Sequence, residues 1–355
     1  MVTESDSIVA ETAARIFADL ADPQTINNAR DTDWKTALWG ATAEAGLPLA
    51  WVPEALGGAG ASLADGFAIL GQAGRFALPV PLAETLLAGW LLAQAGIDAP
   101  KGMMTVAPVR PNEAIEINGS GRLNGRARAV PFGREAEHIA VVASDGKSSA
   151  VALVAAADCR LDDGHNLAGE PSSDLVLADV QPRKLAAAPS SVDRHTLLVM
   201  GGTIRSVQIA GALEAILALC VAYANERVAF ERPIGKFQAV QQNLARLAGE
   251  TAAALAVSGS AADAIAQAGE IDDAIFLEVA SAKIRCAEAV AEGSAIAHQV
   301  FGAIGFTQEH VLHRFTLRML SWRDDFGNES QWAAKLGKDI ARRGADEFWP
   351  LVASR

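Results

Sequence analysis

Cysteine and basic residues are scarce in this 355-residue chain. The three cysteines, Cys159, Cys220 and Cys286, are widely separated and have no spacing typical of a metal site. We expect them to be reduced residues packed in the interior of a cytoplasmic protein. Lysine and arginine number 30 against 42 aspartates and glutamates, which gives a net charge of −12. This acidic balance argues against non-specific binding of nucleic acid.

Targeting and membrane signals are also missing from the sequence. Residues 1–6 are acidic and lack the charged-then-apolar pattern of a signal peptide. The apolar run at 86–93 is too short to cross a bilayer, which takes about 20 such residues. It predicts a buried helix. The six histidines form no metal-ligand cluster, so we predict no metal site. From the absent signal peptide and the short apolar run we predict a cytoplasmic protein with no membrane span.

The periodicity of apolar residues divides the chain into three parts. Residues 1–105 have a helical pattern, and Ser62 follows a glycine-rich turn as a candidate helix N-cap. Residues 106–190 contain short apolar runs separated by Asn-Gly and Asp-Gly dipeptides, which are hairpin signals. Residues 191–355 predict four long antiparallel helices, the last after Trp332, in a bundle. The predicted fold is α+β, with helical, antiparallel β and helical parts in that order.

The segment 227–241 interrupts two long helical patterns. Pro233 stops a helix because it lacks the amide proton, and helical periodicity resumes shortly afterwards. The resulting loop carries a cation (Arg227), an aromatic ring (Phe230) and a side-chain amide (Gln238). Such groups could hold a phosphate, a flat ring and a sugar or ring edge. The alternative is that Arg227 pairs with a surface carboxylate and Phe230 lies in the core.

A second glycine-containing segment lies near the C-terminus. Gln299, Gly302 and Gly305 form a Gln-x-x-Gly-x-x-Gly pattern. Glycine permits close approach of the backbone to a ligand, although a plain loop between two bundle helices would have a similar sequence.

Both segments resemble the acyl-CoA dehydrogenase family. The family carries an Arg-x-x-Phe-Gly turn, here with Glu231 in place of the glycine, and a Gln-x-x-Gly-Gly-x-Gly loop, here with Ala303 in place of one glycine. Similar strings occur at 46–65 and 118–125, so the resemblance covers nearly the whole chain. It implies that the matching residues reach across a dimer interface to the ADP half of the partner's FAD. Those residues are Arg227, Phe230, Gln238, Gln299, Gly302 and Gly305.

The resemblance also implies an activity and partners. Family members use FAD to dehydrogenate an acyl-CoA thioester between its α and β carbons, and an electron-transfer flavoprotein or similar acceptor takes the electrons. The oligomer implied is a homodimer, a homotetramer, or a hetero-oligomer with a second acyl-CoA dehydrogenase subunit.

Two family features are missing. The segment 107–112 lacks the family's flavin-ring motif, and the β part has no tryptophan and no threonine after Thr105. Alignment on Gly327 puts Phe326 where many members carry the catalytic glutamate, and the other usual position, within 200–203, offers no carboxylate. The nearest candidates for the base are Asp325 and Glu329, which alternatively form ion pairs beside Arg323.

Three interpretations fit this combination. The chain resembles the shorter, divergent subunit of heterotetrameric acyl-CoA dehydrogenases that act on bulky thioesters such as sterol side chains. It could instead be a self-sufficient dehydrogenase with Asp325 as its base. A third possibility is a non-catalytic assembly subunit that binds no flavin.

Overall fold

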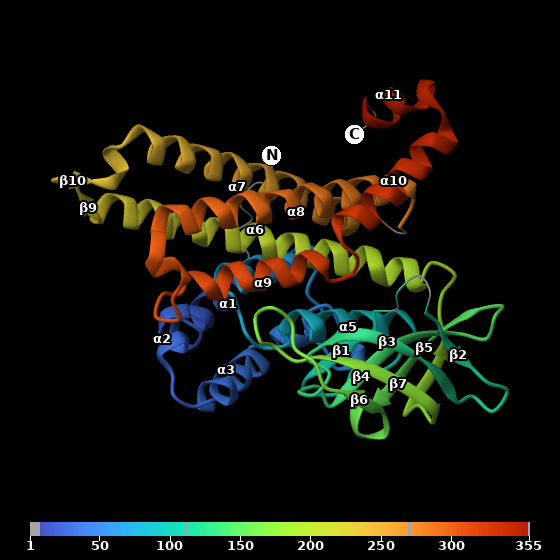
Figure 1. Cartoon of the computed structure of the whole chain (residues 1–355). Coiled ribbons are helices and arrows are strands. Elements are labelled where there is room, and N and C mark those ends of the chain that lie inside the picture. The colour runs from blue at the N-terminus through green and yellow to red at the C-terminus, as the bar shows by residue number, and fades with distance from the viewer. Residues whose placement is uncertain (1–7, 109, 111–112, 269–270, 354–355) are drawn as a thin grey trace.

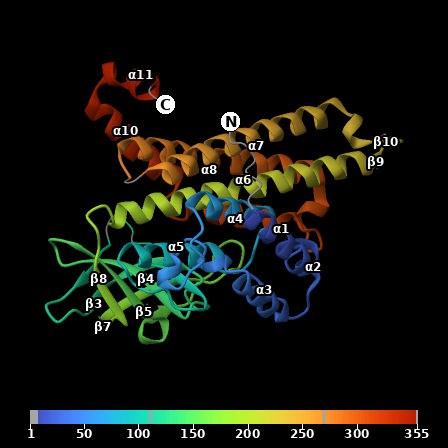
Figure 2. The same cartoon turned by 180° about the vertical axis from the view of Figure 1, so that it is seen from behind.

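The computed structural model describes residues 8–108, 110, 113–268 and 271–353. Part of the 107–112 segment, namely Val109, Pro111 and Asn112, lies outside these described residues. Seen from both sides, long helices form one layer, while the N-terminal helices and the β-sheet lie side by side beneath it (Figures 1 and 2).

The N-terminal part is helical, as predicted. Its elements are α1 (Ile8–Leu20), α2 (Pro23–Asn28), α3 (Asp33–Glu44), α4 (Leu63–Arg75) and α5 (Leu82–Gln94), with the short 3-10 turns η1 (Leu47–Leu49) and η2 (Glu54–Leu56) between α3 and α4. Ser62 caps α4: its hydroxyl accepts from the amide of Asp65, whose carboxylate accepts from the amide of Ser62. The predicted buried helix at 86–93 is confirmed as part of α5, which is buried from Leu82 to Leu92.

The middle part is one sheet in the order β6-β7-β3-β2-β4-β5-β8, with β1 paired to β4. The strands are β1 (Met104–Val106), β2 (Ile115–Ile117), β3 (Leu123–Pro131), β4 (His138–Ser144), β5 (Ser149–Ala155), β6 (Arg160–Asp162), β7 (Ser172–Val180) and β8 (Lys184–Ala187), with η3 (Ala156–Asp158) after β5. Most pairings are antiparallel, as predicted. Two are not, because β1 and β2 both run parallel to β4.

The two faces of this sheet have different neighbours. Ile139 and Val141 of β4 face a separate β core, whereas Ala140 and Val142 belong to the main core with α5. This alternation follows from the two-residue period of a strand. The sheet is therefore fastened to the helices through one face.

The C-terminal part is built around α6 (Arg194–Glu226), which packs against α4, α7 (Gln238–Gln267), α8 (Asp273–Phe301) and α9 (Leu312–Asp324). The small elements β9 (Val228–Ala229), β10 (Arg232–Pro233) and η4 (Ile234–Lys236) join α6 to α7, and η5 (Gly302–Phe306) follows α8. The chain continues as α10 (Glu329–Arg343) and α11 (Ala345–Ala353).

The position of the fourth bundle helix was predicted wrongly. We expected it after Trp332, but α9 fills that place and Trp332 lies in the first turn of α10. Trp332 is 2% exposed and stacks on Phe276 of α8. This apolar residue therefore holds the start of α10 against α8 and does not belong to a fourth bundle helix.

One helix among the described residues, α6, is long and apolar enough by length and composition to cross a membrane. Half of that apolar window is buried inside the protein, and the core helix of a soluble protein passes the same test. Its apolar surface is explained by the three bundle helices and α4 around it.

Candidate functional site

Arg227 and Phe230 lie on a small hairpin at one end of the bundle (Figure 1). Strands β9 and β10 are joined by Phe230 and Glu231, which both have positive φ angles, +51° and +67°. Two consecutive left-handed residues are typical of a type I′ turn. Phe230 is 90% exposed, so the alternative that it belongs to the core is wrong. Arg227 and Gln238 are exposed as well.

The second predicted segment lies at the same end. Gln299 is exposed in the last turn of α8, and Gly302 ends that helix with φ +64°. Gly305 is buried, and a Cβ there would lie 2.9 Å from Cβ of Phe301. The rings of Tyr223 in α6 and Phe301 in α8 are 4.5 Å apart between centroids. This contact places the hairpin and the glycine-containing loop close together, as the predicted nucleotide contact requires.

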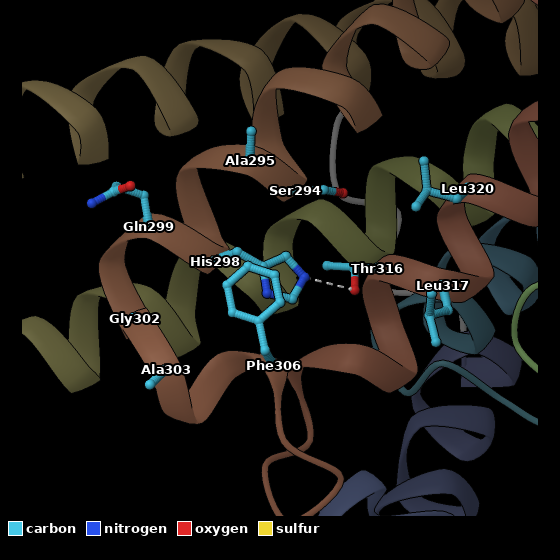
Figure 3. A pocket seen from close by; sticks show the side chains of 10 residues that line it. All are labelled: Ser294, Ala295, His298, Gln299, Gly302, Ala303, Phe306, Thr316, Leu317 and Leu320. Carbon is cyan, nitrogen blue, oxygen red and sulfur yellow. Dashed lines mark hydrogen bonds between the residues drawn. The ribbon is translucent and has the colours of Figure 1, made fainter.

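A cavity of about 610 Å³ opens beside this loop, between α8, η5 and α9 (Figure 3). Its volume falls within the range of small-molecule sites, roughly 300–1,000 Å³. Gln299 and Gly302 were predicted, whereas the other lining residues were not. The complete lining is Ser294, Ala295, His298, Gln299, Gly302, Ala303, Phe306, Thr316, Leu317 and Leu320.

The lining of the cavity is mostly apolar, with a few polar side chains. His298 lies 3.2 Å from the Thr316 hydroxyl through Nε2 and stacks on Phe306 with centroids 4.4 Å apart. Burial lowers the pKa of His298, an effect that the Gly305 backbone partly offsets. The Ser294 hydroxyl is buried with no hydrogen-bond partner in the described structure. No sequence pattern singled out these residues, because they are adjacent only through the packing of α8 on α9.

Asp325, a candidate base, is held by a buried arginine. Its Oδ2 accepts from Nε of Arg205 at 2.9 Å, and Nη2 of Arg205 donates to Oε1 of Glu84 at 2.5 Å. The side chains of Arg205 and Glu84 are each 3% exposed. Burial raises the pKa of both carboxyl groups, while the guanidinium between them counteracts this. Asp325 therefore already has a structural partner from α6.

The next residue, Phe326, occupies the position predicted for the family's glutamate. A Cβ on Gly201 of α6 would lie 2.3 Å from the Phe326 ring, so the two positions predicted for a base are in direct contact. Phe326 has φ +55°, and its carbonyl accepts from Nε1 of Trp332 at 3.1 Å. Lys283 donates to the carbonyls of Trp322, Arg323 and Asp325, at 2.8–3.2 Å. These bonds fix the backbone of the segment.

Glu329 is separated from this cluster. It is the first residue of α10, its side chain is 40% exposed, and Oε2 lies 4.0 Å from Nε of Arg323. The structure thus brings the six predicted nucleotide-contact residues to one end of the bundle and leaves Asp325 and Glu329 elsewhere. Across residues 8–353, wherever the structure is described, no group of three or more potential metal ligands occurs.

The β part offers no hydroxyl to a flavin ring at Thr105. Its side chain is fully buried and donates to the carbonyl of Pro131 at 2.6 Å. The Thr105 hydroxyl proton is therefore bound to the protein backbone and is not free for a cofactor.

Comparison with known proteins places the chain in a family. Residues 3–104 match the acyl-CoA dehydrogenase N-terminal domain and residues 196–328 match the acyl-CoA dehydrogenase C-terminal domain, together more than half of the chain. Acyl-CoA dehydrogenase IpdE2 of Mycobacterium tuberculosis is 27% identical over 98% of both chains.

Two solved structures share the fold. One is from the ChsE4-ChsE5 complex of Mycobacterium tuberculosis, with a TM-score of 0.85, 24% identity, and coverage of 97% of this chain and 99% of that one. The other is from the Tcur3481-Tcur3483 steroid ACAD, a G363A variant, with a TM-score of 0.82, 26% identity, and coverage of 95% and 97%. The chain therefore belongs to the acyl-CoA dehydrogenase family.

Proposed function

We propose that this chain is one subunit of a mixed acyl-CoA dehydrogenase, in which it holds the ADP half of an FAD whose ring lies in a second subunit. The proposal rests on a contrast between the end of the bundle with the predicted nucleotide contacts and the predicted position of the catalytic base. The nucleotide end is open, with a cavity beside Gln299 and Gly302 and an exposed Arg227. Phe326, at the position predicted for the base, packs instead against Gly201.

The chemistry of the residues fits an ADP group. The cavity lining contains no Asp, Glu, Lys or Arg, so it suits an uncharged ring, whereas the Arg227 guanidinium suits a phosphate. Gly302 has the backbone conformation that glycine accommodates, and nothing lies within 4 Å of the position its Cβ would occupy. When bound, FAD supplies the acceptor for the β-hydride of the thioester.

In the proposed complex this chain binds and orients the ADP half of FAD and excludes water from it, but it moves no proton. Phe326 offers no group to take the α-proton, and Arg205 occupies the Asp325 carboxylate. The base and the flavin ring are then the second subunit's contribution. Both similar solved structures come from two-protein assemblies, one of them a steroid ACAD, which supports this division and a bulky acyl-CoA as the substrate. We place the complex in the cytoplasm, with an electron-transfer flavoprotein or similar acceptor as its oxidant.

The flavin content of the purified protein tests the proposal. The chain alone should contain almost no FAD, and co-expression with a longer acyl-CoA dehydrogenase from an adjacent reading frame should restore one FAD per pair of chains. Absorbance after denaturation gives this ratio. One FAD per chain in the isolated protein would refute the proposal and return attention to Asp325 as a base. A stable pair without flavin would instead indicate a non-catalytic assembly subunit.

A substitution inside the cavity connects the flavin to this chain. Ala303→Phe fills the cavity and should abolish flavin retention by the pair without preventing assembly. Ala43→Phe, on the exposed surface of α3, is the matched control and should keep the flavin. Equal flavin content in both variants would show that the cavity does not contact the cofactor.

A further inference from the structure

The cavity beside the glycine-containing loop is lined by a buried hydroxyl that the protein itself does not satisfy. Ser294 of α8 is 8% exposed, and its Oγ has no hydrogen-bond partner among the described residues. Other buried hydroxyls in the long helices differ, since Thr203, Ser206 and Thr251 each donate to the carbonyl four positions earlier, at 2.8–3.0 Å. A buried polar group without a partner costs stability, so its presence here needs an explanation.

The other buried polar groups around Ser294 are directed elsewhere. The Thr316 hydroxyl donates to the carbonyl of Leu312 at 3.3 Å and lies 3.2 Å from Nε2 of His298. Nδ1 of His298 also lacks a partner among the described residues, but it faces the loop backbone, because a Cβ on Gly305 would lie 3.5 Å from it. Ser294 is therefore the buried group of the lining whose hydrogen bond is left for a ligand.

Phe306 forms a flat wall of the same cavity (Figure 3). One face of its ring stacks on His298, with centroids 4.4 Å apart and an angle of 25° between the planes. The side chain is nevertheless 73% exposed, which leaves the opposite face of the ring open. An aromatic ring with an open face is a platform on which a planar heteroaromatic ring stacks.

We propose that Ser294 and Phe306 select adenine as the occupant of this cavity, Phe306 by stacking on the face of the ring and Ser294 by a hydrogen bond to its edge. Neither residue belongs to the Gln-x-x-Gly-x-x-Gly pattern. This assignment rests on the proposed function, in which the cavity takes the uncharged ring of the ADP half of FAD.

The two contacts favour a purine over the acyl chain of a thioester. An alkyl chain suits the apolar part of the lining, but it would leave the Ser294 hydroxyl unsatisfied. Adenine has ring nitrogens that accept a hydrogen bond and an amino group that donates one, and a hydroxyl complements either. Binding of adenine thus satisfies the group that the free chain leaves unpaired.

The stability of the isolated chain tests the state of this hydroxyl. Ser294→Ala removes the unsatisfied group and should raise Tm by roughly 1–3 °C. Ser206→Ala is the matched control, because it removes a buried serine hydroxyl that has a partner, and it should not raise Tm. Thermal unfolding measures both variants. A Tm for Ser294→Ala no higher than that of the original chain means that the hydroxyl is already satisfied, and it overturns the proposal.

Flavin binding by the co-purified pair of subunits tests the occupant. After removal of the flavin, fluorescence titration gives the Kd for FAD and for FMN, which lacks the adenine. Ser294→Ala should weaken FAD binding about 2- to 10-fold and Phe306→Leu about 5-fold or more, with the affinity for FMN unchanged. The controls are Ser206→Ala and Ile304→Ala, an exposed residue of η5 outside the cavity lining, and they should change neither affinity.

The outcomes separate this assignment from the proposed function. A pair that binds FAD equally tightly in the original form and in both cavity variants overturns the assignment of Ser294 and Phe306 alone. Equal losses of affinity for FAD and FMN also overturn it, since the two residues would then act without contacting the adenine. One FAD per isolated chain, or a pair that never binds flavin, overturns the proposed function together with it.

Discussion

At the scale of single residues, the region around α6 is defined by buried charge. Arg205 joins Glu84 of α5 to Asp325 after α9, and Gln208 accepts from its third nitrogen at 2.7 Å. A buried ion pair adds little net stability, but removal of one partner leaves the other charge uncompensated. Each residue of this cluster should therefore tolerate substitution poorly.

Substitutions in the cluster should follow a definite order. Arg205→Met leaves the buried Glu84 without a counter-charge and Asp325 with only the nearby Lys283, and should cost about 3–5 kcal/mol in the free energy of unfolding. Asp325→Asn keeps the Glu84 pair and should cost about 1–3 kcal/mol. Glu329→Gln, at a partly exposed site, should stay within about 0.5 kcal/mol. Urea denaturation measures all three, and an Asp325→Asn variant as stable as Glu329→Gln would contradict the assigned role.

Lys283 makes the stability of the protein depend on pH in the alkaline range. Burial lowers its pKa from 10.5 to about 8. Between these values the unfolded chain keeps a proton that the folded chain has released, so the free energy of unfolding rises with pH. The rise attributable to Lys283 is up to about 1.4 kcal/mol per pH unit.

Comparison with Lys283→Met isolates this contribution. The difference in free energy of unfolding between the original chain and Lys283→Met should increase in favour of the original chain from pH 8 to pH 10. The same difference between the original chain and the control Lys338→Met, at an exposed site, should stay constant. Urea unfolding at a series of pH values gives both differences. Parallel curves for the original chain and Lys283→Met would show that Lys283 stays protonated in the folded state.

At the scale of elements, α4 and α6 touch through their backbones. A Cβ on Gly211 of α6 would lie 2.2 Å from the carbonyl oxygen of Gly71, and one on Gly74 of α4 would lie 2.1 Å from that of Gln208. This close crossing brings the N-terminal helices near enough to α6 for Glu84 to reach Arg205. The glycines are thus required by packing rather than by a turn.

Alanine substitutions should show opposite effects at two helical glycines. Gly211→Ala forces α4 away from α6 and should destabilise the protein by at least about 2 kcal/mol. Gly249→Ala, on the exposed surface of α7 with nothing within 4 Å, should stabilise it by up to about 1 kcal/mol. Thermal unfolding distinguishes them. A Gly211→Ala variant with an unchanged Tm would mean that the two helices can separate without cost.

Local sequence signals predicted the helices and strands well but predicted the contacts between them poorly. Hairpin dipeptides and capping residues are local, so the β4–β5 turn at Asp145-Gly146 and the Ser62 cap could be found. The parallel pairing of β1 with β4 joins residues 34 positions apart, such as Met104 and His138, and has no local signature. Arg205 in an apolar helix gave no sign of its partners, because both come from other elements.

At the scale of the whole molecule, the three predicted parts share one core. The main apolar cluster combines residues of α1, α5, β4, α6 and α8, and Arg205 links α5 to the segment after α9. Two further apolar clusters lie beside this core, one within the bundle formed by α6, α7, α8 and α9 and one on the far face of the sheet. The parts are therefore joined by buried contacts rather than by flexible linkers.

Unfolding of the isolated chain should consequently be a single cooperative transition. Differential scanning calorimetry should give equal calorimetric and van't Hoff enthalpies, because the helices at both ends of the chain depend on α6. Arg205→Met is the informative comparison, since it cuts the link between α5 and Asp325. Two separate transitions in the original chain would show that residues 1–105 or 106–190 fold independently.

The length of α6 has a consequence for how this protein can change. Arg205 lies in α6 and Arg227 is the C-cap residue of that helix, roughly 33 Å further along at 1.5 Å per residue. Arg205 lies over the Phe326 ring, whereas Arg227 begins the hairpin. Residues so far apart with no shared partners have additive effects. A double-mutant cycle of Asp325→Asn and Glu231→Gln should thus give a coupling energy near zero. Sequence drift can erase chemistry at one end of the helix while recognition at the other end stays under selection.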